Sequence, residues 1–378
     1  MSTSQLRVLH VLGSLGVGGV ETWLVSLARR IDRSRVAMDF LVHAEVRGGY
    51  TEEIRESGGR ILLCPLGRDP VGYAARFLRL LRVNGPYQVV HSHQHHFSGY
   101  VLWLARLAGV PGRIAHSHND TRRCDAESGL MRKLYLRAME SAIWMNATAG
   151  IGANQVAAEA LFGKRWRDDS RNRVIYCGID TEPFHRKWPK EEVRAELGIP
   201  SSAFVVGHTG RFDEQKNHAF LVQLAEELAK RVPEARFLWV GDGSLRPDIR
   251  DRVVAAGLSD RVVMPGTRRD VARLLCAMDV FVFPSLRESN PLSLTEAQAA
   301  GLPCIVSDAI SDEAFSLPSL VTALPLDCGA RKWAAAVAAT RSATPGATQI
   351  EALEVIEQSS FNCSVSARKT QQVYEAYR

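Results

Sequence analysis

The chain has 378 residues, more than one hydrophobic core usually serves, so its length favours two domains. Hydrophobic residues make up 46% and charged residues 23% of it, a composition that excludes a generally disordered chain. The net charge of +6 is uneven, because residues 1–186 carry 25 Lys and Arg against 17 Asp and Glu, whereas residues 187–378 carry 22 against 24. A basic first half suits an anionic substrate, a lipid surface or nucleic acid, and charge alone does not decide among them.

The seven cysteines are scattered and include no C-x-x-C pair, which predicts reduced thiols in a cytoplasmic protein. No uninterrupted apolar run reaches the length of a membrane span, since the best candidate, "GYVLWLARLAGV", carries Arg106. We therefore expect a cytoplasmic protein. Peripheral contact with the inner face of the cytoplasmic membrane is a further property that the basic first half allows.

Short apolar runs alternate with helical stretches twice along the chain. The clearest helix is 19–31, "GVETWLVSLARRI", in which Trp23, Leu24 and Leu27 share one face. The alternation predicts parallel sheets with helices on both faces, that is, doubly wound α/β domains. The expected strands are 6–13, 36–43, 60–66, 88–93, 113–118, 147–153 and 173–179, then 204–210, 236–243, 261–266, 279–285 and 303–308.

The segment "GIDTEPFHRKWPKEEVRAELGIPSSA" separates the two halves and is rich in charge, Pro and Gly. We predict an N-terminal Rossmann-like domain at 1–185 and a second at 186–363, with a final helix, 364–378, that packs back on the first. Ligands of such domains bind at the carboxyl ends of the strands, so we expect the functional residues there.

The first expected strand ends in "GSLGVGGVE", where Gly13, Gly16, Gly18 and Gly19 lead into a helix. Glycines allow close backbone approach, and a helix N-terminus attracts phosphate. The spacing is neither G-x-G-x-x-G nor the P-loop pattern, which weakens a dehydrogenase interpretation, although Glu45 could imitate its ribose-binding acid. A glycine-rich turn without a ligand is the alternative.

Four histidines, His91, His93, His95 and His96, lie at or just after the end of the strand 88–93. They have no accompanying carboxylate or cysteine pattern, so a strand end near an acceptor pocket explains them better than a zinc site. There is also no Asp-x-Asp in the sequence. We predict that the protein uses no metal and no other cofactor.

Two segments of the second half carry charge at strand ends. In "GRFDEQKNHAF", Arg211 and Lys216 flank a loop before a helix that we expect Asn217 to cap, an arrangement suited to a diphosphate. A surface charge pair is the alternative interpretation.

In "DVFVFPSLRESNPLSLTEAQAAGLP", we expect Asn290 as the N-cap and Pro291 as the first helical residue, with Gly301 ending the helix. Glu288 then lies in the loop, and Glu296 points from the helix toward the crevice. Carboxylates accept hydrogen bonds from paired hydroxyls, as in sugars and ribose, and the helix N-terminus suits phosphate. A sugar and a ribose joined by a diphosphate form a nucleotide sugar.

Together these segments resemble the retaining, GT-B-fold glycosyltransferases of family four, especially their bacterial exopolysaccharide branch. The resemblance implies two Rossmann-like domains with parallel sheets facing across a cleft. It also implies transfer of a hexose-type sugar from a nucleotide-diphosphate sugar to an acceptor glycan, lipid-linked, in exopolysaccharide, capsule or lipopolysaccharide synthesis. It implies no nucleic-acid partner. The matching pieces are "GGVE" (18–21), "HSH" (91–93), "RIAHSHND" (113–120), "GIDTEPF" (178–184), "GRFDEQKNH" (210–218), "VGDG" (240–243) and "ESNPLSLTEAQAAGLP" (288–303).

The resemblance also implies roles for single residues. Gly18 and Gly19 would approach the donor diphosphate, which Arg211 and Lys216 would neutralise. Glu288 would hold hydroxyls of the donor sugar and Glu296 those of the ribose. The backbone of Asn290, Pro291 and Leu292 would lie along the sugar and phosphates. The base pocket would be lined by Gly266, Thr267 and Arg268. His116 would be the active-site histidine, with His118 as a less favoured substitute.

One departure concerns the motif Glu-Ser-Asn-Pro at 288–291, where the family often has Glu-Gly-Phe-Gly or Glu-Gly-Leu-Pro. This departure leaves the identity of the donor sugar open, but it does not change the predicted reaction. Two other functions stay open at this point: a nucleotide-sugar epimerase of similar fold, and a non-catalytic nucleotide-sugar-binding protein. A glycosidase is disfavoured, because its two carboxylates must face one another across the bond.

Overall fold

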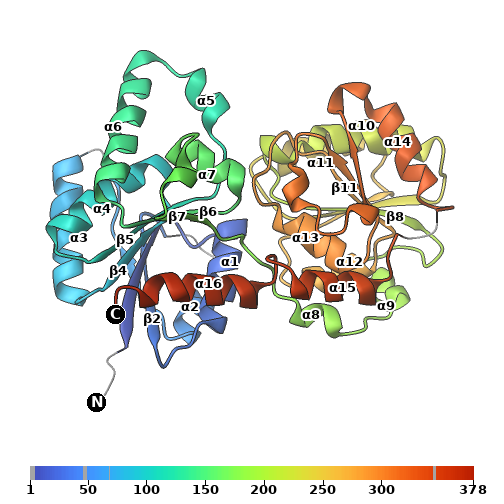
Figure 1. The fold of residues 1–378 in the computed structure, drawn as a ribbon. Helices are drawn as coiled ribbons and strands as arrows, with labels where there is room; N and C mark the ends of the chain where they lie inside the picture. The colour runs from blue at the N-terminus through green and yellow to red at the C-terminus, as the bar shows by residue number, and fades with distance from the viewer. Residues whose placement is uncertain (1–4, 46–48, 68, 344–345) are drawn as a thin grey trace. The chain divides into compact units, whose positions relative to one another are not determined.

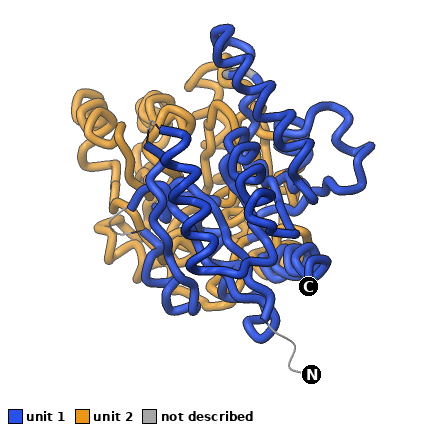
Figure 2. The backbone as a smooth tube through the Cα atoms, turned by 90° about the vertical axis from the view of Figure 1, so that its left-hand side faces the viewer, with its two compact units in different colours: residues 1–178, 363–378 blue, residues 179–362 orange. Residues whose placement is uncertain are grey.

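The computed structural model describes residues 5–45, 49–67, 69–343 and 346–378, and the chain forms two compact units. Unit 1 comprises Met1–Gly178 with Cys363–Arg378, and unit 2 comprises Ile179–Asn362 (Figure 2). Each unit is a parallel sheet with helices on both faces (Figure 1), so the α/β class expected from the alternation of strands and helices is confirmed.

In the described part of unit 1, seven strands form one parallel sheet in the order β3-β2-β1-β4-β5-β6-β7. The register places His10 of β1 beside His91 of β4. The strands are β1 (Leu6–Leu12), β2 (Val36–Val42), β3 (Ile61–Leu63), β4 (Val89–Ser92), β5 (Gly112–Ser117), β6 (Ala149–Gly152) and β7 (Asn172–Val174).

The helices of unit 1 cover this sheet and bury Leu9, Val90 and Ala115 of its central strands. The helix α16 (Cys363–Glu375) lies against α1 (Gly19–Arg30), where Trp23 Nε1 donates to Ser366 Oγ at 3.1 Å. The other helices are α2 (Thr51–Glu56), α3 (Pro70–Asn84), α4 (Ser98–Leu107), α5 (Arg122–Ala126), α6 (Leu130–Asn146) and α7 (Gln155–Phe162).

The unit boundary lies between Gly178 and Ile179, earlier than the expected division at 185 and 186. Ile179 N donates to Phe361 O at 2.8 Å, and Ile179 forms a bridge with Asn362. This backbone pairing assigns the start of "IDTEPF" to unit 2. A charged, Pro-rich stretch therefore marked the neighbourhood of the boundary but not its position.

Six strands of unit 2 form a parallel sheet within the described residues, in the order β10-β9-β8-β11-β12-β13. They are β8 (Phe204–Thr209), β9 (Ala235–Val240), β10 (Val262–Gly266), β11 (Val280–Phe283), β12 (Cys304–Ser307) and β13 (Val321–Leu324). The sequence did not predict β13, an edge strand of four residues that lacks the continuous apolar run of a central strand.

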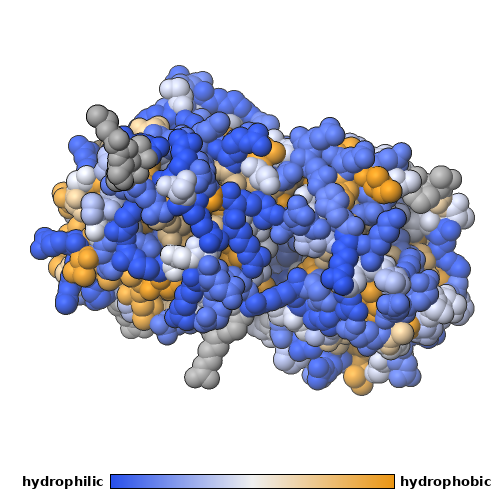
Figure 3. Space-filling model, turned by 90° about the horizontal axis from the view of Figure 1, so that it is seen from below, coloured by the Kyte–Doolittle hydropathy of each residue, from blue (hydrophilic) through white to orange (hydrophobic). Residues whose placement is uncertain are grey.

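The core of unit 2 contains Phe237, Trp239, Val282 and Trp333. Its helices are α8 (Glu182–His185), α9 (Lys190–Glu196), α10 (His218–Ala229), α11 (Arg246–Ala255), α12 (Val271–Cys276), α13 (Leu292–Ala299), α14 (Ala330–Ala339) and α15 (Gln349–Gln358). No helix within the described ranges is long and apolar enough to cross a membrane. The face in Figure 3 is mostly hydrophilic, with apolar side chains in separate groups.

Candidate active site

In unit 2, the structure pairs Lys216 with Glu288. Lys216 ends the 3₁₀ turn η3 (Glu214–Lys216), and Glu288 lies in the loop between β11 and α13. Lys216 Nζ donates a hydrogen bond to Glu288 Oε1 at 2.6 Å, and the two side chains are only 16% and 7% exposed. The ammonium also lies 4.6 Å from the centre of the Phe283 ring, a cation–π contact. An ammonium and a carboxylate thus meet, largely shielded from water, at the carboxyl edge of the sheet.

Glycine is required where the loop after β8 meets the loop after β9. Gly210 N donates to Val240 O and Phe212 N donates to Asp242 O, each at 3.0 Å. At Gly241, φ is 141° and a Cβ would lie 2.0 Å from Gly210 O, so no other residue fits. The backbone of the segment "VGDG" therefore holds the start of the Arg211–Lys216 loop in place through hydrogen bonds.

Asn217 does not cap α10 with its side chain, so this prediction was wrong. Its backbone is left-handed, with φ of 55°, and no cap hydrogen bond forms. The amide Nδ2 instead donates to Pro284 O at 3.1 Å, and Leu286 N donates to Gln215 O at 2.8 Å. Asn217 therefore ties together the two loops that carry Lys216 and Glu288.

The helix α13 begins at Leu292, one residue later than predicted. Pro291 occupies the N-cap position because its ψ of 89° lies outside the helical region, which leaves Asn290 before the cap. Pro291 O accepts the N–H of Leu294 at 2.9 Å and that of Thr295 at 3.2 Å. The N–H of Leu292 belongs to the first turn, which has no intrahelical acceptors and carries the positive end of the helix dipole.

Glu296 lies one turn into α13 and is half-buried. Burial raises the pKa of its carboxyl to about 7. Within the described residues the carboxyl group has no hydrogen-bond or ion-pair partner, in contrast to Glu288. A half-buried carboxyl group without a partner is stabilised when hydroxyl groups donate hydrogen bonds to its oxygens.

The other predicted residues of unit 2 are spread along its strand ends. Arg211 is exposed, as is Thr267 at the end of β10. Gly266 has a left-handed backbone, with φ of 82°. Arg268 donates to Asp270 through Nε at 2.8 Å and Nη2 at 2.6 Å, which raises the pKa of its guanidinium. The side chain proposed for the base pocket is thus already held in an ion pair.

Two buried histidines near Lys216, His208 and His218, were not predicted from the sequence. His218 stacks on Phe212 with ring centres 3.8 Å apart, and His208 Nδ1 donates a hydrogen bond to Val282 O at 2.9 Å. Burial lowers the pKa of His208 to about 3 and that of His218 to about 2, so both rings are neutral. Their only sequence signal was a polar residue inside the apolar run "FVVGHTG" and another opening a helix.

In unit 1, Gly18 precedes α1 with an extended backbone and Gly19 is the first residue of that helix. Gly18 O accepts the N–H of Thr22 at 2.9 Å, so the helix starts at the expected place. The first turn of α1 therefore presents backbone N–H groups beside the glycines, as a phosphate site requires.

His116 belongs to a cluster of five histidines at the carboxyl ends of β1, β4 and β5. The histidine cluster consists of His10, His91, His93, His116 and His118. His116 is completely buried; its Nδ1 lies 3.1 Å from His91 Nε2, and its ring stacks on that of His118 with centres 3.9 Å apart. His116 Nε2 is buried and has no hydrogen-bond partner among the described residues.

Burial lowers the pKa of every ring in the histidine cluster, and neighbouring rings lower several of them further. The pKa of His10 and that of His118 fall to about 3, and the pKa of His116 falls well below its usual value. All five imidazoles are consequently neutral near pH 7. His95 and His96 lie outside the cluster and pair with each other through their Nδ1 atoms at 2.8 Å.

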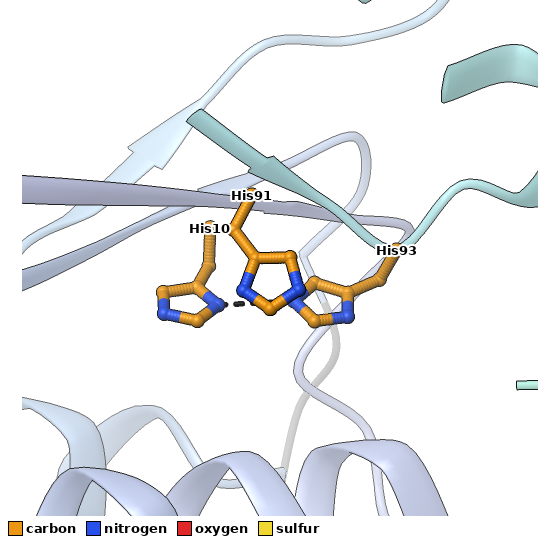
Figure 4. Close-up of side chains that lie close together, drawn as sticks. All are labelled: His10, His91 and His93. Atoms are coloured by element: carbon orange, nitrogen blue, oxygen red, sulfur yellow. Dashed lines mark hydrogen bonds between the residues drawn. The ribbon is translucent and has the colours of Figure 1, made fainter. Parts of the chain in front are cut away.

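Among the described residues, two sets of three histidines come close enough to hold a metal ion: His10, His91 and His93, and His93, His116 and His118. In the first set, drawn in Figure 4, His10 Nδ1 and His93 Nε2 share a hydrogen bond at 3.0 Å. The ring of His91 is tilted by 33° to that of His93, with ring centres 4.3 Å apart. His10 and His93 thus bind each other, while the nitrogens of His91 bind Tyr374 and His116; the absence of a metal stays a prediction.

Two family models cover most of the chain. "Glycosyltransferase Family 4" matches residues 17–183, and "Glycosyl transferases group 1" matches residues 203–338. A Bacillus subtilis protein that bears the name glycosyltransferase EpsF is 37% identical over 346 residues, which cover 91% of this chain and 90% of that protein. The chain belongs to the family 4, group 1 glycosyltransferases.

Other similarities agree with this family. An Escherichia coli UDP-Gal:alpha-D-GlcNAc-diphosphoundecaprenol alpha-1,3-galactosyltransferase is 31% identical over 226 residues, 59% of this chain and 58% of that protein. The structure of Anabaena HepE with UDP-glucose superposes with a TM-score of 0.80 at 18% identity, covering 98% of this chain and all of that one. WaaG, a lipopolysaccharide glycosyltransferase, superposes with 0.76 at 15% identity, covering 97% and 99%. These structures establish the GT-B fold of this glycosyltransferase.

The structure groups the predicted site residues of this glycosyltransferase in two places. In unit 2, Lys216, Glu288 and the start of α13 come together through hydrogen bonds between their loops. In unit 1, His116 lies among four further histidines. The sequence predicted individual residues of each group. Their contacts with one another depend on strand register and on the packing of the loops.

Proposed function

We propose that this glycosyltransferase transfers a hexose, with retention of configuration, from a nucleotide-diphosphate sugar to a hydroxyl of a lipid-linked glycan in exopolysaccharide, capsule or lipopolysaccharide synthesis. The observation that carries the proposal is the shielded Lys216–Glu288 pair beside the start of α13. It offers one cation for a diphosphate and one carboxylate for sugar hydroxyls. The name of the Escherichia coli relative makes a UDP-hexose and a diphosphate-linked lipid the first substrates to test.

Lys216 and Arg211 would stabilise the diphosphate as it leaves. The ammonium of Lys216 has three N–H donors, of which one binds Glu288, so the others remain for phosphate oxygens. Arg211 adds a second, exposed cation, and the first turn of α13 adds N–H donors at Leu292. These groups stabilise charge that develops on the leaving group, which is the main way to lower the barrier of such a transfer.

Glu288 and Glu296 would hold the two ends of the donor. Lys216 donates to Oε1 of Glu288, so Oε2 can accept a hydroxyl of the transferred sugar. Glu296 would accept the ribose hydroxyls. Because the pKa of Glu296 is raised to about 7, those hydroxyls would favour its ionised form and bind best above that pH.

In the proposed reaction, the bond between the anomeric carbon and the diphosphate oxygen breaks while the acceptor hydroxyl attacks the same face. The departing phosphate oxygen takes the hydroxyl proton, so no enzyme nucleophile is needed. We place the buried Nε2 of His116 beside the reacting sugar, where it can exchange a hydrogen bond with a hydroxyl. Gly18 and Gly19 would approach the diphosphate from unit 1, and Gly266, Thr267 and Arg268 would line the base pocket.

We also propose peripheral contact with an anionic membrane through α6. Leu130, Met131 and Leu134 of this helix are 74%, 80% and 50% exposed, unusually high values for large apolar side chains. The exposed Arg132 and Lys133 lie between them. Apolar insertion combined with basic residues is the composition of a membrane-surface helix.

The test is a transfer assay with labelled UDP-hexoses and a diphosphate-linked lipid glycan, in the presence of EDTA. Formation of labelled lipid glycan with UDP released only when acceptor is present, and an anomeric configuration equal to that of the donor, supports the proposal. Epimerised sugar without an acceptor would indicate an epimerase. Donor binding without turnover over a panel of acceptors would indicate a binding protein. Either outcome overturns the proposed function.

A further inference from the structure

The histidine cluster is an unbranched chain of hydrogen bonds that ends at His116. His116 Nδ1 lies 3.1 Å from His91 Nε2, and His91 Nδ1 lies 2.7 Å from the hydroxyl of Tyr374. That hydroxyl lies 3.3 Å from His10 Nε2. The chain continues from His10 Nδ1 to His93 Nε2 at 3.0 Å, from His93 Nδ1 to His118 Nε2 at 2.8 Å, and from His118 Nδ1 to Cys177 Sγ at 3.7 Å.

Every link of this chain runs in the same sense, from the Nδ1 of one ring toward the Nε2 of the next, with the Tyr374 hydroxyl inserted once. A neutral imidazole has one N–H donor and one lone pair. Each link needs one donor and one acceptor. Because the Tyr374 hydroxyl has a single proton, it donates on one side and accepts on the other, so the donor-to-acceptor direction is the same before and after it. The five rings are therefore all Nε2–H tautomers or all Nδ1–H tautomers.

The end of the chain is the atom that the reaction would use. His116 Nε2 is buried and lacks a partner among the described residues. In the Nε2–H state this atom is a donor, and in the Nδ1–H state it is an acceptor. The tautomer of the whole chain thus decides whether His116 donates to or accepts from a sugar hydroxyl.

Tyr374 is the link of the chain that comes from the final helix rather than from the strands of unit 1 or the residues that follow them. It lies on α16. A 3.1 Å hydrogen bond between Trp23 and Ser366 joins this helix to α1, and an ion pair between Arg35 and Glu375 at 3.0 Å holds its end. Its hydroxyl is the bridge between the pair His91–His116 and the three rings of His10, His93 and His118. The segment that returns from unit 2 therefore completes the chain.

We propose that Tyr374 is a positioning residue that sets the tautomer of His116 by joining the two parts of the histidine cluster into one hydrogen-bonded chain. Its catalytic consequence rests on the proposed function, because it requires His116 to lie beside the reacting sugar. The coupling of tautomers does not depend on that function.

The first test is the nitrogen NMR spectrum of the protein labelled with ¹⁵N-histidine, since Nδ1 and Nε2 shifts distinguish the tautomers. The proposal expects one shared tautomer for all five rings in the unmodified protein. In Tyr374→Phe, which removes only the hydroxyl, the tautomer mixture of His116 changes although the residue does not touch position 374. Mixed tautomers within the unmodified chain, or unchanged His116 shifts in the variant, would overturn the proposal.

The second test is kinetic, with Tyr377→Phe as the matched control, because Tyr377 follows the same helix and its hydroxyl is not part of the chain. Tyr374→Phe should lower kcat about tenfold and leave the donor KM unchanged, while Tyr377→Phe should change neither. An altered His116 tautomer with unchanged kcat would overturn the catalytic role of Tyr374 and leave the coupling of tautomers standing. If the unmodified enzyme transfers no sugar, the proposed function fails, whereas the NMR result still decides whether the chain is coupled.

Discussion

In unit 2 the candidate site includes a charged pair, Lys216 and Glu288, whereas in unit 1 it is a cluster of neutral histidines. Lys216 and Glu288 satisfy each other as a 2.6 Å ion pair. The five imidazoles satisfy one another through hydrogen bonds instead, and burial keeps them uncharged. A charged pair suits a ligand that brings its own charge, such as a diphosphate, because it can share its cation. A neutral chain suits a polar but uncharged ligand, such as a sugar hydroxyl.

The largest expected effect comes from breaking the charged pair. Lys216→Ala should lower kcat/KM for transfer by about 10²–10³-fold, the usual cost of removing a group that stabilises transition-state charge. It should also lower the free energy of unfolding by about 3–5 kcal/mol, because Glu288 is left buried without its partner. Transfer assays and urea unfolding measure the two effects.

Lys230→Ala is the matched control, since Lys230 forms an ion pair of similar length, 2.7 Å, with Glu227 but is 68% exposed. It should change both quantities little. The double variant Lys216→Met with Glu288→Leu should regain stability without regaining activity. Recovery of activity in that variant would show that the pair is structural only.

The next effect concerns the backbone that supports the charged pair. Gly241→Ala should lower the free energy of unfolding by about 3 kcal/mol, since a Cβ would meet Gly210 O at 2.0 Å in addition to the strain of a φ of 141°. Gly257→Ala isolates the backbone cost, about 1–2 kcal/mol, because φ is 66° there and nothing lies within 4 Å of the added atom. Equal losses in the two variants would contradict the close loop contact.

A pH dependence should separate Glu296 from the neutral histidines. Donor affinity should rise about tenfold from pH 6 to pH 8, as Glu296 ionises with its pKa of about 7, and Glu296→Gln should abolish the rise. Calorimetry with an intact nucleotide sugar is the measurement, because its phosphates do not titrate in this range. A persisting pH dependence in Glu296→Gln would assign the effect to another group.

The same raised pKa affects stability with the opposite sign. Burial favours the protonated form of Glu296 in the folded state, so its contribution is complete below the ordinary Glu pKa of 4.5 and is lost as pH rises through about 7. Ligand-free protein should therefore lose stability between pH 5 and pH 8, and Glu296→Gln should lose less. Thermal unfolding at several pH values tests this sign.

The smallest expected effect is at the membrane. Lys133→Gln on α6 should weaken binding to vesicles with anionic lipid about fivefold, corresponding to roughly 1 kcal/mol for one basic residue near the surface. Leu107→Ser on α4 is the control for apolar exposure elsewhere, since Leu107 is 61% exposed and should not change vesicle binding. Cosedimentation measures both, and equal binding by all three proteins would remove α6 from the proposal.

The sequence alone determined the fold class and supplied the candidate site residues. Apolar runs that alternate with helical segments have few solutions other than doubly wound sheets, and the motif with Glu288 and Glu296 is local in the chain. Position within a motif singled out Lys216 and His116 as candidates and placed the start of α13 to within one residue. These features depend on short-range chemistry, which a sequence displays directly.

The tertiary structure decided what these residues touch. The Lys216–Glu288 hydrogen bond joins two loops. Asn217 does not cap α10 as predicted, because its left-handed backbone directs its side chain to Pro284 O. The hydrogen-bonded histidines come from three strands, and Tyr374 comes from the end of the chain. Which side chains meet is set by strand register and by a returning helix, and these long-range pairings leave no periodic signal in the sequence.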